Sequence, residues 1–124
     1  MSQVIHTNNA PEAIGPYSQA VSVGNLVFTS GQIAINPATG AVEADTIEAQ
    51  TEQVCQNLTE VLKAAGTSIE KAVKTTCFLR NMEDFAAFNQ IYGNYFTSKP
   101  ARSCVAVREL PKNVLVEVEV IAEI

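Results

Sequence analysis

Apolar and polar residues alternate most regularly near the end of the chain. Over residues 114–120 a valine occupies every second position, and Glu117 and Glu119 lie between the valines. Successive side chains of a β-strand point to opposite faces of the sheet. The pattern therefore predicts a strand with its valines on a buried face and both glutamates on the other face.

The rest of the chain divides into short apolar runs and two segments of helical period. Residues 46–65 are expected to form a helix, with Asp45 and Glu48 as a capping pair and Gly66 as the stop. A second helix is expected to begin after Asn81, its N-cap. Its apolar face is formed by Phe85, Phe88, Tyr92 and Phe96. Further strands are expected over 20–23, 26–30, 73–79 and 101–107, and the last over 114–122.

This order of strands, helix, strand, helix and strands predicts an α+β fold in one domain over residues 1–124. Two helices cover only one face of such a sheet. Residues 26–28 and 77–79 are apolar in consecutive positions, which is typical of strands that lose water on both faces. We therefore expect a homo-oligomer whose sheets meet face to face.

The composition narrows the function classes. The 124 residues carry 13 acidic and 8 basic side chains, for a formal net charge of −5. This charge repels a phosphate backbone, and no run of Lys or Arg offsets it, so nucleic-acid binding is not expected. The three cysteines fit neither a zinc site nor a disulfide framework, and we expect reduced thiols in a cytoplasmic protein. Neither a secretion signal nor a membrane-spanning segment is expected.

Three charged residues are candidates for chemistry. If the second sheet face is an interface, Glu117 or Glu119 is partly buried, which raises the pKa of a carboxyl group that has no partner. The alternative is a solvated pair on an exposed face. Arg102 follows the rigid Pro100, on a strand expected to pair with the strand of Glu117. Its guanidinium matches a substrate carboxylate through two hydrogen bonds, and the alternative is a weak surface ion pair.

Other candidates are more ambiguous. Cys104 has no obvious base, because the only histidine, His6, lies far away in the sequence, so packing is favoured over nucleophilic catalysis. The stiff loop over residues 10–18, with two prolines and a glycine, is expected to hold Tyr17 in place. Ser30 and Gly31, at a strand end, offer backbone amides and a close approach for a ligand.

Four segments together resemble the RidA family, also called YjgF-like proteins. They are AIGPYSQ (13–19), TSGQI (29–33), PARSCV (100–105) and VEVE (116–119). The resemblance runs in order over nearly the whole chain. It implies a chorismate-mutase-like fold, related to the ferredoxin-like fold, with two helices on one sheet face. It also implies a homotrimer in which the sheets form a central barrel and ligand clefts lie at the subunit interfaces.

The resemblance further implies a 2-iminobutanoate/2-iminopropanoate deaminase. Such an enzyme hydrolyses the imine and enamine forms of 2-aminocrotonate and 2-aminoacrylate to 2-keto acids and ammonia, without metal or cofactor. Arg102 would bind the carboxylate, Glu117 would position or activate water, and Tyr17 would close the cleft. The cleft would be lined by Ser30, Gly31, Asn89 and the backbone at Cys104. The sequence departs from the common family pattern at Ala106, Arg108 and Glu109, which bears on substrate preference.

Three other functions remain open. A regulatory trimer would use Arg102 to bind small carboxylates without turnover. Relatives have been described as endoribonucleases or translation inhibitors, but the acidic charge and the lone His6 offer neither a basic track nor an acid–base pair. A chorismate-mutase activity would follow from the fold alone.

Overall fold

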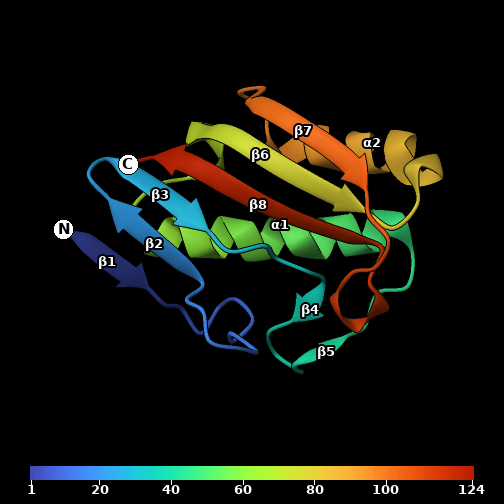
Figure 1. The fold of residues 1–124 in the computed structure, drawn as a ribbon, viewed down its shortest axis with the longest axis horizontal. Helices are drawn as coiled ribbons and strands as arrows, with labels where there is room; N and C mark the ends of the chain where they lie inside the picture. The colour runs from blue at the N-terminus through green and yellow to red at the C-terminus, as the bar shows by residue number, and fades with distance from the viewer.

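A six-stranded mixed sheet with two helices on one face forms the body of the protein (Figure 1). The computed structural model describes residues 1–124. The strand order in the sheet is β1-β2-β3-β8-β6-β7, and a small hairpin, β4-β5, lies apart from it. The strands are β1 (Ser2–Ile5), β2 (Ala20–Val23), β3 (Leu26–Thr29), β4 (Ile35–Asn36), β5 (Ala41–Val42), β6 (Ala72–Leu79), β7 (Ala101–Ala106) and β8 (Val116–Glu123), and the helices are α1 (Ile47–Ala64) and α2 (Phe85–Tyr95). The predicted α+β class with both helices on one face is confirmed.

The alternating valines of β8 form part of the hydrophobic core. Val116, Val118 and Val120 are fully or almost fully buried, and they pack in the same cluster as the apolar stripe of α1. Glu117 and Glu119 point to the opposite face, as predicted. The strand begins two residues later than expected, because Pro111–Asn113 forms a 3-10 turn just before it.

Helix capping differs from the prediction. Thr46, not Asp45, is the N-cap of α1, and its hydroxyl accepts a hydrogen bond from the Ala49 amide at 3.2 Å. Asn81 caps no α-helix: it precedes a 3-10 turn, Met82–Asp84, and its side chain makes no capping bond. Because the 3-10 turn occupies the residues directly before it, α2 begins only at Phe85.

The partner of β7 also differs from the prediction. The strand of Arg102 was expected to pair with the strand of Glu117, but β7 pairs in parallel with β6, and β6 pairs in turn with β8. The reason is that α2 connects β6 to β7, and a helical crossover returns the chain parallel to the strand it left. Strand β7 therefore lies at the sheet edge, one strand away from β8.

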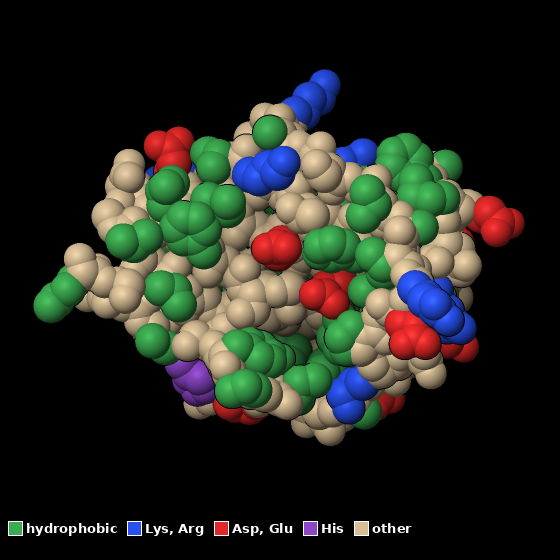
Figure 2. Space-filling model, viewed as in Figure 1, with side chains coloured by type: hydrophobic (Ala, Val, Ile, Leu, Met, Phe, Trp, Pro, Cys, Tyr) green, Lys and Arg blue, Asp and Glu red, His purple; other side chains and the backbone are tan.

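The sheet face opposite the helices carries exposed apolar side chains. Val4, Val23, Phe28 and Val105 all lie on this face and are between 39% and 70% exposed. Figure 2 shows hydrophobic side chains spread over it, with acidic side chains near its middle. Neither helix has the combined length and apolar character needed to cross a bilayer.

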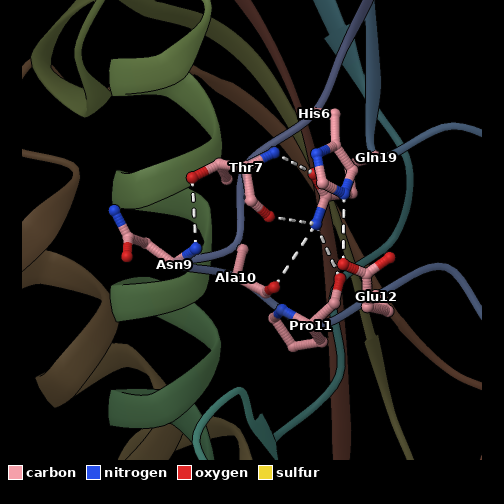
Figure 3. A network of polar contacts seen from close by, with 7 residues as sticks. All are labelled: His6, Thr7, Asn9, Ala10, Pro11, Glu12 and Gln19. Carbon is pink, nitrogen blue, oxygen red and sulfur yellow. Dashed lines mark hydrogen bonds and ion pairs between the residues drawn. The ribbon is translucent and has the colours of Figure 1, made fainter.

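The loop that joins β1 to β2 is fastened by one buried side chain, that of Gln19 (Figure 3). Its amide oxygen accepts from the Thr7 amide at 2.7 Å, and its amide nitrogen donates to the carbonyl oxygens of Thr7, Ala10 and Pro11 at 3.0, 3.4 and 2.7 Å. Gln19 is only 2% exposed. One side chain thus holds the loop that leads to Tyr17.

Replacing Gln19 with alanine leaves these buried backbone groups without partners, so we expect Gln19→Ala to lower the free energy of unfolding by about 2–4 kcal/mol. Urea unfolding at one fixed protein concentration measures the change. The control is Gln90→Ala, because the Gln90 side chain on α2 is exposed and forms no hydrogen bond within the chain. A loss at Gln19 no larger than the loss at Gln90 would show that the network does not stabilise the fold.

Candidate functional site

Four of the residues singled out in the sequence line one cavity of about 420 Å³: Tyr17, Ser30, Gly31 and Glu117. The loop before β2, the end of β3 and the open face of β8 form its walls. The other lining residues include the apolar Ile14, Ile33, Ile35 and Pro111 and the polar Glu12, Gln19 and Gln32. The cavity therefore has mixed apolar and polar walls, and its two carboxylates are those of Glu12 and Glu117.

Gly31 and Glu117 are in direct contact. An isolated bridge between Gln32 and Val118 brings the chain after β3 against β8, and its two backbone hydrogen bonds measure 2.9 and 3.1 Å. A Cβ atom at residue 31 would overlap the Glu117 carboxylate. A larger residue here would displace the Glu117 side chain, so glycine leaves the space in which the carboxylate lies.

The Glu117 carboxyl group is half-buried and has no cationic partner in the chain. Burial, and to a smaller extent the negative charge of Glu119, raises the pKa of Glu117 above that of an ordinary glutamate. A carboxylate with a raised pKa binds a proton more readily than a solvated one. This property suits a group that accepts and returns protons during a reaction.

Ser30 and Tyr17 are held by hydrogen bonds within the cavity wall. The Ser30 hydroxyl donates to the Ser18 carbonyl oxygen at 2.5 Å, and the Ser30 amide donates to the Gln19 carbonyl oxygen at 2.9 Å. The Tyr17 hydroxyl accepts from the Ile14 amide at 3.2 Å, and its side chain is 46% exposed at the rim. The loop thus holds Tyr17 in the cavity wall, with part of its side chain exposed to solvent.

Arg102, Asn89 and Cys104 form a second group, on β7 and α2. The Arg102 guanidinium donates from Nη1 to Asn89 Oδ1 at 2.7 Å. It has no carboxylate within ion-pair distance, because the one ion pair in the chain joins His6 to Glu12. The alternative of a surface salt bridge is therefore wrong for the single chain. Four of the five guanidinium N–H donors remain free of protein acceptors.

Cys104 lies near this arginine but is held as a thiol. Burial raises the pKa of Cys104, and the positive charge of Arg102 offsets only part of that effect. Its side chain packs against the main core cluster. The thiol is thus protonated at neutral pH, in keeping with the packing role favoured from the sequence.

The two groups point to opposite faces of the sheet. Arg102 is in register with Thr75 of β6, which is buried under α2, so its side chain lies on the helix-covered face. Glu117 is in register with Phe78, three positions along β6, and lies on the open face. Strands β7 and β8 are also separated by β6, which places their backbones about 10 Å apart. No single chain brings Arg102 and Glu117 to one ligand.

In the sequence, Phe85 and Tyr92 fall on the apolar face of the second helix, and they were given no part in the site. Both rings lie beside the Arg102 guanidinium, whose Cζ is 5.4 Å from the Phe85 ring centroid and 4.9 Å from that of Tyr92. The spacing of Phe85, Asn89 and Tyr92 along α2, four and then three residues, places them on one helix face. This spacing was visible in the sequence, but a core face has the same period.

Known proteins resemble the chain over its whole length. The family model described as Endoribonuclease L-PSP matches residues 7–124. A Lactococcus lactis protein named as a candidate regulator, AldR, is 52% identical, and the match covers 98% of each chain. An Escherichia coli protein named 2-iminobutanoate/2-iminopropanoate deaminase is 49% identical, again over 98% of each chain.

The fold also agrees closely with that of a solved structure. The crystal structure of YyfA, a Rid-family protein from Yersinia pestis, is 50% identical, covers 100% of both chains and superposes with a TM-score of 0.97. Identity near one half over full length far exceeds what one shared motif would give, and it confirms the resemblance seen in the sequence. The chain therefore belongs to the endoribonuclease L-PSP family, which includes the RutC and RidA proteins.

Proposed function

We propose that this protein is a deaminase that hydrolyses small 2-imino acids to 2-keto acids and ammonia. The observation that carries the proposal is the half-buried Arg102, whose charge has no acidic partner in its own chain. A half-buried cation without a counterion is costly unless an anion binds it. The guanidinium is suited to a planar carboxylate, which every 2-imino acid carries. The deaminase name of the E. coli relative supports the same reaction.

The site would be assembled between neighbouring subunits. Arg102 and Asn89 of one subunit would face the cavity that holds Glu117, Gly31, Ser30 and Tyr17 in the next. Two features support this arrangement: the two groups lie on opposite faces of one sheet, and the open face is apolar and uncovered in the single chain. A homotrimer in which the open faces form a central barrel would bury that surface and bring the groups together.

The chemistry needs only water and a proton carrier. Glu117 accepts a proton from water as the water oxygen bonds to C2 of the imine, and the C=N electron pair moves to nitrogen, which takes up a proton from solvent. The tetrahedral amino alcohol then collapses. Its hydroxyl proton passes to solvent as the C=O bond forms, the C–N bond breaks, and ammonia departs with the proton returned by Glu117. Arg102 holds the carboxylate throughout, which keeps C2 beside the Glu117 carboxylate.

A regulatory role is the second candidate, because the AldR relative bears a regulator's name. A regulator would bind small carboxylates through Arg102 and would not need Glu117 as a proton carrier. Glu117→Gln separates the two functions. An enzyme would lose activity and keep its affinity for 2-oxobutanoate, the product of 2-iminobutanoate hydrolysis. A regulator would show no turnover even as wild type.

The activity test couples the protein to a threonine dehydratase and follows 2-keto acid formation where spontaneous hydrolysis of the imine is slow. We expect wild type to accelerate the reaction and Arg102→Ala to lower kcat/KM at least about 100-fold, since a desolvated carboxylate loses two charge-assisted hydrogen bonds. Arg80→Ala is the charge-matched control, because the exposed Arg80 bonds only a backbone carbonyl. Equal acceleration by wild type and Arg102→Ala would place the site elsewhere.

The pH dependence tests the role of Glu117. Water activation needs the ionised carboxylate, and the raised pKa of Glu117 means that kcat/KM begins to fall at a pH above the ordinary glutamate value of about 4.3. Glu119→Gln removes one of the two causes of the raised pKa. We therefore expect its acidic limb to move to lower pH.

The matched control is Glu123→Gln, which removes an exposed carboxylate from the same face of β8, further from Glu117. Its acidic limb should coincide with that of wild type. An unchanged or higher midpoint in Glu119→Gln would contradict the expected effect of the Glu119 charge on the acidic limb set by Glu117.

A further inference from the structure

The Arg102 guanidinium lies against three side chains of α2. Asn89 accepts its hydrogen bond at 2.7 Å, and the rings of Phe85 and Tyr92 lie 5.4 and 4.9 Å from its Cζ. All three contacts come from one helix face, at residues spaced four and three apart. The direction in which the guanidinium presents its free N–H groups is therefore set by α2.

All three partners of this arginine are uncharged. A carboxylate at any of these positions would hold Arg102 equally well, but it would neutralise the charge and compete with a substrate carboxylate. Aromatic faces and an amide oxygen attract the cation through a quadrupole and a dipole, and they leave its net charge intact. The surroundings orient the arginine and keep it available to an anion.

Tyr92 is the most firmly held of the three. Its hydroxyl and the Thr75 hydroxyl form a buried hydrogen bond at 2.7 Å, and Thr75 is the residue of β6 in register with Arg102. Its ring stacks on Phe96, with centroids 4.4 Å apart at 21°, and contacts Phe88 at 5.3 Å. Tyr92 thus ties the position of the guanidinium to the packed core and to the adjacent strand.

We propose that Tyr92 is a positioning residue, which sets the affinity for the substrate carboxylate through its ring contact with Arg102, with Phe85 in a lesser role. This inference rests on the proposed function, because it concerns the same carboxylate site. Tyr92 does not itself touch the reacting atoms. Its effect should therefore appear in binding and not in the chemical step.

The test compares Tyr92→Leu, Tyr92→Phe and Phe88→Leu, each assayed with the coupled dehydratase and titrated with 2-oxobutanoate by calorimetry. Tyr92→Leu removes the aromatic face, so KM and the Kd of 2-oxobutanoate should rise about 5- to 10-fold while kcat stays within about twofold. Tyr92→Phe keeps the face and loses only the bond to Thr75, so it should bind within about twofold of wild type. Phe85→Leu should raise KM about threefold and leaves the Tyr92 packing in place, which keeps the test decisive if Tyr92→Leu does not fold.

Phe88→Leu is the control for core damage, because Phe88 is fully buried on the same helix and contacts Tyr92 but not the guanidinium. It should lower stability without raising KM. The proposal is overturned if Tyr92→Leu and Phe85→Leu bind as wild type does, or if Phe88→Leu weakens binding as much as they do. If wild type binds 2-oxobutanoate but turns over no imine, the proposed function has failed and the titrations still decide the role of Tyr92.

Discussion

Side-chain alternation along the strands is the constraint on which the rest of this structure depends. The valines of β8 fill the core under α1, and the same alternation sends Glu117 to the open face. On β7 it sends Arg102 the other way, under α2, because β7 is in register with the buried side of β6. A one-residue shift of either strand would exchange these faces. The strand register therefore determines that Arg102 lies on the helix-covered face and Glu117 on the open face.

The consequence is that the candidate site residues fall into two separate groups. One group has Arg102 with neutral neighbours, and the other has the half-buried Glu117 carboxylate against Gly31. Each group is costly by itself, since Arg102 lacks a counterion and burial raises the pKa of Glu117. Under the proposed function, pairing the two groups across subunits would let a bound carboxylate compensate the arginine. It would also cover apolar side chains such as Phe28 and Val105.

Much of the fold could be predicted from the sequence, because local periodicity carries it. The valine and glutamate alternation of β8 and the apolar stripe of α1 both appear as expected. The partner of β7 could not be predicted locally, because pairing depends on the crossover through α2. The N-cap was misplaced by one residue, since both Asp45 and Thr46 carry a suitable oxygen and only the backbone conformation decides between them.

The candidate site was predictable as a set of residues but not as an arrangement. Ser30, Gly31, Glu117 and Tyr17 do share a cavity, and Arg102 and Asn89 are hydrogen-bonded. Their separation into two groups follows from the register of β7 and β8 against β6, which the sequence alone does not reveal. The contact of Tyr92 with Arg102 was hidden because a helix face that holds an arginine has the same period as one that fills a core.

Mixed trimers test the shared site most directly. Arg102→Ala and Glu117→Gln chains carrying different tags are co-expressed, and assemblies with both tags are isolated and assayed for imine hydrolysis. In a ring of three with one type of interface, each mixed trimer contains one interface that receives Arg102 from one chain and Glu117 from the other, so activity should return to about one third of wild type. Mixed assemblies no more active than either variant alone would contradict a site built from two subunits.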